Sequence, residues 1–184
     1  EEGDAALLPR KGLDWADKFG ALARAAKTLP DALIDGEIVA LGHNGVPSFS
    51  ALQAAIADNK TGDLIFFAFD LLFANGEDLR ALPLRERKER LRRLLARWNG
   101  KQKLIRYVDH FEDRGDAVME SARKLELEGI VSKRRDAPYV SGRSQSWLKS
   151  KCGMEQEFVI IGWRPSDKPR RPFRSLLLAV REEG

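Results

Sequence analysis

The chain has 184 residues, of which 43% are hydrophobic and 33% charged, enough for one ordinary domain with a core and a small remainder. No stretch approaches the ~20 consecutive apolar residues of a membrane-spanning helix. The acidic N-terminal residues lack the basic and apolar pattern of a secretory signal. The chain has one cysteine, Cys152, which excludes an internal disulfide and is typical of a protein in the reducing cytoplasm. The net charge of +4 is divided unevenly, because residues 1–80 hold seven Lys and Arg against thirteen Asp and Glu, whereas residues 81–184 hold twenty-five against fifteen.

The acidic first part of the chain predicts two helices and two strands in alternation. Apolar residues recur at spacings of three and four before residue 27, which is the period of a helix. An aliphatic stretch that ends in a turn cluster indicates a strand, and a later, nearly continuous apolar run is typical of a strand buried on both faces. In chain order the expected elements are a helix capped by Asp14 and running to residue 26, a strand over 33–41, a helix started by Ser48 or Ser50 and running to residue 56, and a strand over 64–73.

The basic second part predicts two more helices and then only short strands. Pro83 is expected to open the longer helix, with its leucines inward and most of its arginines outward. A basic helix of this kind either binds a polyanion such as nucleic acid or is simply a solvated surface. The elements expected after it are a strand over 103–108, a helix capped by Asp113 or Asp116 and running to residue 125, and strands over 130–133, 146–151, 157–163 and 174–180.

This order of elements predicts an α+β fold of largely antiparallel sheets with helices packed against them. A domain boundary is expected near Cys152 and Gly153, after the last predicted helix. The remaining residues, 153–184, are too few for a domain of their own and could supply only the first strands of a small barrel such as the OB-fold.

Two short segments carry residues suited to metal and phosphate chemistry. Asp35 and Glu37 share one face of the predicted strand, where Glu37 either meets a metal ion or a hydroxyl, or simply faces solvent. Trp147, Lys149 and Lys151 also share one face, with the two ammonium groups about 7 Å apart along the strand. That spacing matches a phosphate chain, unless the lysines belong to an exposed amphipathic strand.

Aromatic and loop residues add to these segments. The phenylalanines within 66–69 are expected mainly in the core, but one of them could line a pocket and stack on a planar base. Glu128 and Lys133 stand at opposite ends of a predicted strand and could share a pocket only through a bend. Tyr139 and Arg143 lie in a Gly/Ser-rich loop that could order on a phosphate backbone. Carboxylates for Mg²⁺, lysines for phosphates and an aromatic ring for a base together predict a site for nucleotide chemistry.

In this order and spacing the segments resemble the motifs of the covalent nucleotidyltransferases, the superfamily of ATP-dependent DNA ligases, RNA ligases and capping enzymes. Residues 68–79 and 147–152 are most similar to the ligase domain of bacterial DNA ligase D, the end-joining enzyme. The resemblance implies the nucleotidyltransferase fold, which is ATP-grasp-like, followed by the first strands of an OB-fold. The matching segments are 8–12 for the arginine-containing segment, 35–37 for the third motif, 66–72 for the aromatic motif, 128–133 for the fourth and 147–151 for the fifth.

The resemblance also implies a role for each motif residue. Glu37 would contact the ribose or the metal, Phe69 would stack on adenine, and Lys149 and Lys151 would hold the phosphates. The implied cofactors are ATP and Mg²⁺ or Mn²⁺. The residues implied to hold the nucleotide are Arg10, Glu37, Phe69, Lys133, Lys149 and Lys151; those implied to bind the metal are Glu37 and Glu128; those implied to bind DNA are Arg10, Arg143 and Trp147.

One motif of the family has no counterpart in the chain. The first motif places a nucleophilic lysine two residues before an Asp-Gly pair, whereas the pair formed by Asp35 and Gly36 is preceded there by Leu33. Nothing upstream of Arg10 matches either. We therefore expect no catalytic nucleophile in the chain, an adenylation domain without its N-terminal part over residues 1–152, and the start of a truncated OB-fold domain over residues 153–184.

The resulting hypothesis is that the parent protein is an ATP-dependent DNA ligase that seals nicks or broken ends through a lysyl-AMP intermediate and an adenylated 5′-phosphate. The isolated chain is expected to be inactive. The alternatives are an RNA ligase or capping-type nucleotidyltransferase, and a non-catalytic nucleic-acid-binding module. The expected partners are nicked or broken duplex DNA, the Ku end-binding protein, and polymerase and nuclease domains of the same parent chain, in the cytoplasm at the bacterial nucleoid and away from any membrane.

Overall fold

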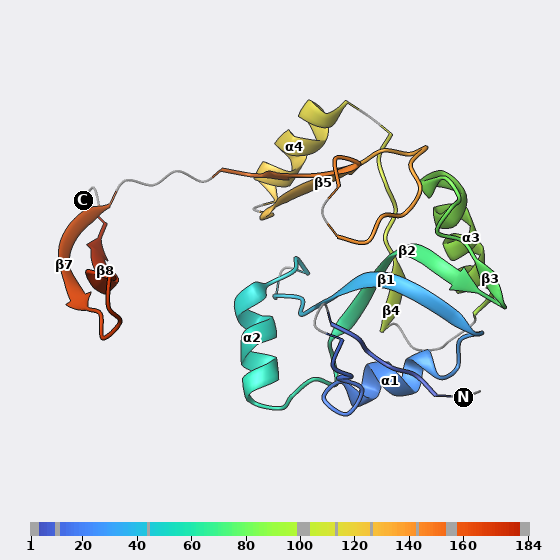
Figure 1. Ribbon diagram of the computed structural model, residues 1–184, viewed down its shortest axis with the longest axis horizontal. Helices are drawn as coiled ribbons and strands as arrows, with labels where there is room; N and C mark the ends of the chain where they lie inside the picture. The colour runs from blue at the N-terminus through green and yellow to red at the C-terminus, as the bar shows by residue number, and fades with distance from the viewer. Residues whose placement is uncertain are drawn as a thin grey trace. The chain divides into compact units, whose positions relative to one another are not determined.

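The computed structural model describes residues 4–9, 12–43, 45–98, 104–112, 114–125, 127–142, 144–153 and 158–180. The chain forms two compact units, Glu1–Cys152 and Gly153–Gly184 (Figure 1). Each described helix is too short or too polar to cross a lipid bilayer.

The main sheet of the first unit is built around β2 (Ile65–Ala74). β2 pairs antiparallel with β1 (Ala32–Val39) and, through a turn at Asn75 and Gly76, with the short β3 (Glu77–Asp78). Both turn residues have positive φ, 49° and 84°, as a tight hairpin turn requires. β4 (Ile105–Tyr107) pairs with the other edge of β2 and runs parallel to it, so the sheet is largely but not wholly antiparallel.

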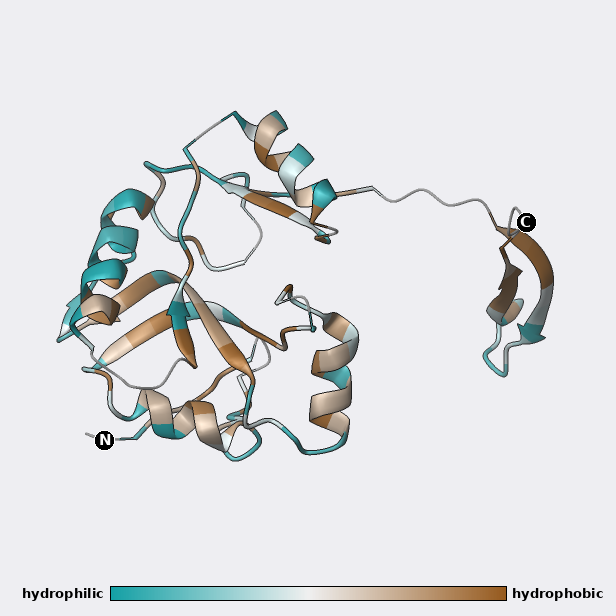
Figure 2. Cartoon of the chain, turned by 180° about the vertical axis from the view of Figure 1, so that it is seen from behind, coloured by the Kyte–Doolittle hydropathy of each residue, from teal (hydrophilic) through white to brown (hydrophobic). Residues whose placement is uncertain are grey.

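Helices cover this sheet and close two apolar clusters with it. α1 (Gly20–Ala26), the first residue of β4 and residues next to α1, β1 and β2 share the cluster of Phe19, Leu22, Ala25, Ala40, Leu64 and Ile105. α3 (Leu84–Arg97) packs the buried Leu91 against Ala68 and Leu71 of β2. α2 (Phe49–Ala57) adds half-buried residues to the first cluster. In Figure 2 the hydrophobic colouring follows β1 and β2, where burial is expected.

Two helix starts differ from the expected ones. The Asp14 carboxylate accepts hydrogen bonds from the backbone N–H groups of Leu7 and Ala16, both 2.9 Å, so it fastens the preceding segment to a turn and the regular helix begins only at Gly20. α4 (Gly115–Lys124) has Arg114 at its N-cap, with Asp116 inside the first turn, and Asp113 lies outside the described residues.

The other predicted starts are confirmed. The Ser48 hydroxyl accepts a hydrogen bond from the Ala51 N–H at 3.2 Å and begins α2, and Pro83 precedes the first residue of α3. The prediction of leucines inward on α3 is confirmed: Leu84 and Leu91 are buried, and Leu94 and Leu95 pack against the apolar clusters. Arg87 and Lys88 are buried beside them.

A second, smaller sheet in the first unit pairs β5 (Gly129–Lys133) antiparallel with β6 (Trp147–Lys151). The segment that follows β5, residues 134–139, is fastened to the start of α3. Its carbonyl groups at Arg135 and Ala137 accept hydrogen bonds from the N–H groups of Arg85 and Leu84, at 3.0 and 3.1 Å. We call residues 134–139 the strap, because it connects the smaller sheet to the main one.

The second unit consists of an antiparallel hairpin of β7 (Val159–Pro165) and β8 (Phe173–Ala179). Its apolar side chains are largely exposed, with Ile161 at 65% and Trp163 at 66%. Within the described residues, two strands can form a hairpin but not a closed barrel.

Candidate nucleotide site

Residues from both sheets of the first unit meet in a group of aromatic rings around one lysine. The Nζ atom of Lys133, at the end of β5, lies 3.9 Å from the centre of the Phe69 ring and 3.6 Å from that of Trp147. Trp147 also packs edge-on against Phe69 and Tyr139, with ring centres 6.2 and 6.1 Å apart. We call Phe69, Tyr139 and Trp147 the ring cluster; its geometry is that of cation–π contacts with a lysine ammonium.

An irregularity in the main sheet sets the position of Phe69. Asp35 of β1 lies opposite Asp70, but the next residue, Gly36, lies opposite Ala68, so Phe69 is an extra residue with no partner on β1. A bulge of this kind bends the strand and redirects a side chain. Phe66, by contrast, packs against both apolar clusters and belongs to the core.

Two carboxylates act on the ammonium of Lys133, and a phenol contacts one of them. Burial lowers the pKa of Lys133 to about 8, although the nearby Asp70 and Asp35 act to raise it. Burial also raises the pKa of Asp35, against the attraction of Lys133. The Tyr139 hydroxyl donates a long hydrogen bond of 3.5 Å to the Asp35 carboxylate. The interior of the site therefore holds opposite charges that are partly removed from water.

Next to these residues, Asp70 forms a buried ion pair with Arg87. Arg87 of α3 binds Asp70 through two parallel contacts, from Nε to Oδ1 at 2.8 Å and from Nη2 to Oδ2 at 2.9 Å, and both side chains are fully buried. Arg87 Nη1 also donates to the carbonyl groups of Leu82 and Ala137. All three guanidinium nitrogens are thus hydrogen-bonded.

A set of exposed charged side chains lies near β6, the strand that also carries Trp147. Lys149 Nζ contacts the Glu128 carboxylate at 2.6 Å, which lowers the pKa of Glu128 and raises that of Lys149. Glu37 acts on the same ammonium electrostatically, as Lys151 does on Glu128. We call Glu37, Glu128, Lys149 and Lys151 the charged rim.

The charged rim fits a divalent cation that arrives with phosphates. Mg²⁺ usually binds one or two protein carboxylates and completes its shell with water and phosphate oxygens. Glu37 and Glu128 supply two carboxylates that both act on Lys149. Among the described residues there is no group of three or more His, Cys, Asp or Glu that would hold a metal by itself. Within the part of the chain that the structure describes, Glu37 and Glu128 therefore do not form a closed metal site.

The residues predicted from the motifs thus fall into two neighbouring groups. The ring cluster and Lys133 combine Phe69 with Trp147, while the charged rim combines Glu37, Glu128 and both β6 lysines. Glu128 and Lys133 do not share a pocket in these groups, since Glu128 bonds Lys149 and Lys133 lies between rings. Arg10 and Arg143 lie outside the described residues.

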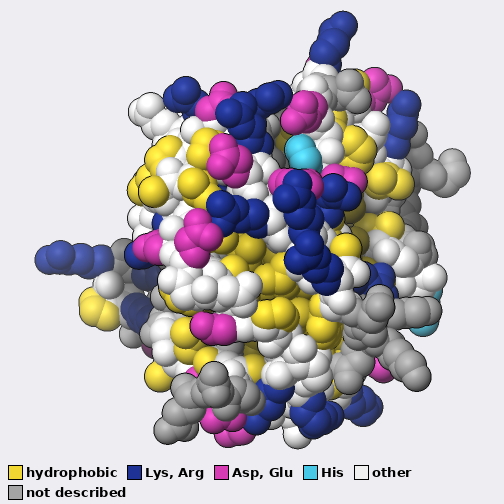
Figure 3. Space-filling view, turned by 90° about the vertical axis from the view of Figure 1, so that its right-hand side faces the viewer, with side chains coloured by type: hydrophobic (Ala, Val, Ile, Leu, Met, Phe, Trp, Pro, Cys, Tyr) yellow, Lys and Arg dark blue, Asp and Glu magenta, His cyan; other side chains and the backbone are white. Residues whose placement is uncertain are grey.

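Two buried residues of the site were missed. Asp70 could have been suspected, because it interrupts an apolar run, but Arg87 is one arginine among many on a basic helix. The exposed arginines of that helix are mostly paired: Arg90 with Glu77 at 2.6 Å, and Arg92 and Arg93 with Glu89. Figure 3 shows the face with α3 and β3, where basic and acidic side chains are mixed around a hydrophobic area.

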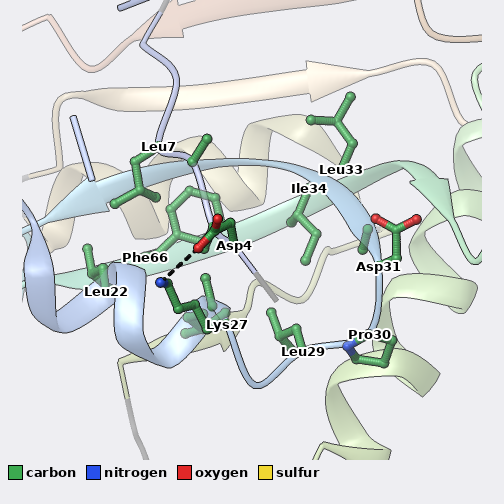
Figure 4. Close-up of a pocket in the computed structure, with 15 residues that line it drawn as sticks. Asp4, Leu7, Leu22, Lys27, Leu29, Pro30, Asp31, Leu33, Ile34 and Phe66 are labelled. Atoms are coloured by element: carbon green, nitrogen blue, oxygen red, sulfur yellow. Dashed lines mark hydrogen bonds and ion pairs between the residues drawn. The ribbon is translucent and has the colours of Figure 1, made fainter. Parts of the chain in front are cut away.

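A cavity in the described part of the first unit lies elsewhere. It has a volume of about 580 Å³ and is lined by the N-terminal segment, α1 and β1 (Figure 4). An ion pair between Asp4 and Lys27, at 3.0 Å, lies at its edge, and its walls include Leu7, Ile34 and Phe66. Phe66 of the aromatic motif lines it, but the described residues with an implied role, Glu37, Phe69, Glu128, Lys133, Trp147, Lys149 and Lys151, do not.

Comparison with known proteins identifies the family. Residues 1–151 match the family model of the ATP-dependent DNA ligase domain. The chain belongs to this family. The multifunctional non-homologous end joining protein LigD of Pseudomonas aeruginosa is 37% identical over 182 residues, covering 98% of this chain and 21% of that protein. The LigD of Mycobacterium bovis is 32% identical over 188 residues, covering all of this chain and 24% of the relative. The chain thus spans about a quarter of the curated relatives it matches.

Solved ligase structures share the fold of the chain. A mycobacterial DNA ligase D complexed with ATP and MES has a TM-score of 0.73 and 33% identity, covering 96% of this chain and 56% of that one. The ligase domain of Mycobacterium tuberculosis LigD has a TM-score of 0.69 and 32% identity, covering all of this chain and 58% of that one. The predicted α+β nucleotidyltransferase fold and the resemblance to the LigD ligase domain are confirmed. Membership of this family favours a DNA ligase over the RNA ligase and capping alternatives.

Proposed function

We propose that this chain is the nucleotide-binding part of an ATP-dependent DNA ligase that joins broken ends of duplex DNA. The observation that carries the proposal is the placement of the ring cluster and the charged rim along one strand, β6, with Trp147 in the first and Lys149 and Lys151 in the second. An adenosine nucleotide has the same order of parts, an aromatic base followed by a chain of phosphates. The end-joining relatives support broken DNA ends as the substrate.

In this proposal the ring cluster receives the base. Phe69 supplies an aromatic surface on which adenine can stack, and Trp147 closes the other side of Lys133. Because the Lys133 ammonium occupies a face of the Phe69 ring, the base takes the other face or displaces the lysine. Asp35 and Asp70 still supply negative charge near a displaced Lys133.

The charged rim receives the phosphates and the metal. In the free protein the Glu128 carboxylate neutralises Lys149. On binding, a phosphate would replace this carboxylate beside Lys149, and the carboxylate would bind Mg²⁺ instead. This exchange leaves neither charge unpaired. When bound, Mg²⁺ would neutralise phosphate charge and polarise the reacting phosphorus. Lys149 and Lys151 hold the phosphates in line, which is where positioning contributes most to phosphoryl transfer.

The parent enzyme would act in three steps. A lysine displaces pyrophosphate from ATP and retains AMP, the AMP passes to a DNA 5′-phosphate, and a 3′-hydroxyl then attacks that phosphate and releases AMP. No residue of this chain matches the nucleophilic lysine. Arg10, Arg143 and Trp147 are proposed to contact DNA. The Ku protein, polymerase and nuclease domains of the parent chain, and a place in the cytoplasm at the nucleoid, belong to the same proposal.

The test is covalent labelling with ATP that carries its label on the α-phosphate. A longer protein that includes the natural coding region upstream of Glu1 is incubated with Mg²⁺ and labelled ATP beside the present chain. We expect label to survive denaturation on the longer protein and not on the present chain. Absence of label on both would instead favour a non-catalytic nucleic-acid-binding module.

In the longer protein, Lys149→Ala should lower the rate of labelling by ~10²-fold or more, since it removes a cation from the phosphates undergoing transfer. Lys60→Ala is the matched control, because Lys60 is an exposed lysine that pairs only with Asp58. The rates are measured by quenching at short times. Equal rates for Lys149→Ala and the unmodified protein would contradict the role of Lys149.

A further inference from the structure

A single buried arginine connects three parts of the chain around the candidate nucleotide site. The guanidinium of Arg87, on α3, binds the Asp70 carboxylate of β2 at 2.8 and 2.9 Å. Its Nη1 atom donates to the carbonyl groups of Leu82, before α3, and Ala137, in the strap, the latter at 3.2 Å. The Arg87 and Asp70 side chains are fully buried, and the two contacts to the carbonyl groups are partly buried.

Such an ion pair restrains geometry more than it stabilises the fold. Removing two charges from water costs much of what their attraction returns, so a buried pair is weak evidence for stability. The planar guanidinium, however, directs each N–H along a fixed line, and the two contacts to Asp70 are parallel. Movement of β2 relative to α3 would break buried hydrogen bonds, and movement of the strap would break a partly buried one.

The anchored residues stand next to the walls of the site. Asp70 directly follows Phe69, the bulged residue whose ring contacts Lys133. Ala137 lies in the strap between Lys133 and Tyr139, and the guanidinium lies 5.9 Å from the centre of the Tyr139 ring. One guanidinium therefore fixes both the strand that carries Phe69 and the segment that carries Lys133 and Tyr139.

We propose that Arg87 is a positioning residue of the nucleotide site, which holds β2 and the strap at the separation that lets Phe69, Lys133 and Tyr139 enclose a base. Arg87 itself touches no nucleotide in this arrangement. The inference rests on the proposed function only in naming the base as the occupant. The spacing of the ring cluster is a property of the free protein and can be tested without nucleotide.

The test is Arg87→Lys in the full chain, which keeps the positive charge but removes the fork that reaches Asp70, Leu82 and Ala137. The first measurement is the titration of Lys133, followed by NMR of lysine-labelled protein and assigned with Lys133→Arg. We expect the pKa of Lys133 to rise from about 8 toward its ordinary value, because the loosened cluster lets water reach the ammonium. The second measurement is the dissociation constant for ATP, which should increase about 10-fold or more.

Lys88→Met is the matched control. Lys88 is the next residue on α3, is also buried, and donates to the Val108 carbonyl at 2.9 Å rather than to β2 or the strap. A general loosening of α3 after loss of a buried hydrogen bond would be common to both variants. We expect Lys88→Met to retain the affinity for ATP, and to raise the pKa of Lys133 only through loss of the nearby Lys88 charge, because burial is the largest cause that lowers it and the ring cluster stays closed.

The outcomes separate this inference from the proposed function. If Arg87→Lys is folded by circular dichroism and leaves both the Lys133 titration and the ATP affinity unchanged, the positioning role is overturned. If Lys133 shifts but the unmodified chain binds no ATP, the nucleotide assignment of the site fails while the role of Arg87 in the ring cluster stands. If Arg87→Lys does not fold, Asp70→Glu, which keeps the pair but lengthens it, is measured in the same two ways.

Discussion

At the scale of single residues, Lys133 shows which of two opposing effects decides the charge of a buried group. Asp35 and Asp70 favour the ammonium, whereas burial among Phe69 and Trp147 disfavours it. The pKa of Lys133 falls to about 8, so burial wins. Near neutral pH the side chain is mainly a cation held between rings, and above pH 8 it becomes increasingly neutral.

This balance predicts a pH dependence of stability that belongs to Lys133. Its pKa is lowered in the folded state from 10.5 to about 8, so between these values the unfolded chain binds more protons and the free energy of unfolding rises with pH. Lys133→Met removes that slope. Urea unfolding of both proteins at intervals from pH 7 to pH 10.5 measures the difference between them. Parallel stability profiles for the two proteins would contradict the buried position of Lys133.

At the scale of elements, β5 and β6 approach each other too closely for a side chain at Gly129. A Cβ atom there would lie 2.2 Å from the Ser150 carbonyl oxygen and 2.8 Å from the Lys151 Cα atom, both of the backbone. The close contact sets the register in which Val131 faces Lys149 and Lys133 faces Trp147. Both parts of the candidate site therefore depend on this glycine.

Gly129→Ala should destabilise the protein by about 1–3 kcal/mol, because the backbone of β6 has to move to admit the methyl group. Gly62→Ala, with nothing within 4 Å of the added Cβ, is the control and should stay within about 0.5 kcal/mol of the unmodified protein. Denaturant unfolding gives both values. If the two variants are equally stable, the strands are farther apart in solution than we describe.

The same elements show what the sequence could predict. Periodicity and turn residues were sufficient for the strands other than the short β3, and for the starts of α2 and α3, since Ser48 and Pro83 act through their nearest neighbours. The parallel pairing of β4 was not predicted, because it joins residues about 40 positions apart. Asp14 failed as a helix cap since its carboxylate also binds the distant Leu7 N–H.

In the candidate site, too, features set by nearby residues could be predicted, whereas features set by residues far apart in the chain could not. Phe69, Lys133 and Trp147 stood out because short motifs contain them, and the structure brings them together. Strand alternation could not reveal the bulge at Phe69, which depends on pairing with β1. Nor could it distinguish the buried Arg87 from exposed arginines, because its burial depends on Asp70, seventeen residues away.

At the scale of the whole molecule, the two units differ in how their backbone is protected. The strands of the main sheet have helices and two apolar clusters around them. The hairpin of β7 and β8 exposes residues such as Ile160 and Trp163, at 60% and 66%. A two-stranded hairpin without a packed face is marginally stable in water.

Amide hydrogen exchange of the intact chain should therefore separate the units. Amides of β1 and β2 are expected to exchange orders of magnitude more slowly than those of β7 and β8, because local opening costs least where few apolar contacts are buried. Mass spectrometry of peptides from each strand measures the rates. Equal protection in both units would show that the hairpin is packed in solution.

The parallel pairing of β4 with β2 also bears on the order in which the chain can assemble during synthesis. β1, β2 and the turn to β3 all precede residue 79, so their antiparallel pairs can form as soon as that part leaves the ribosome. On the edge of β2 away from β1, residues 66–68 wait for Ile105–Tyr107, which follows the whole of α3. An open strand edge is a template for pairing with another chain. Between those two moments of translation, the unpaired edge of β2 is open to pairing with other nascent chains that are translated from the same mRNA.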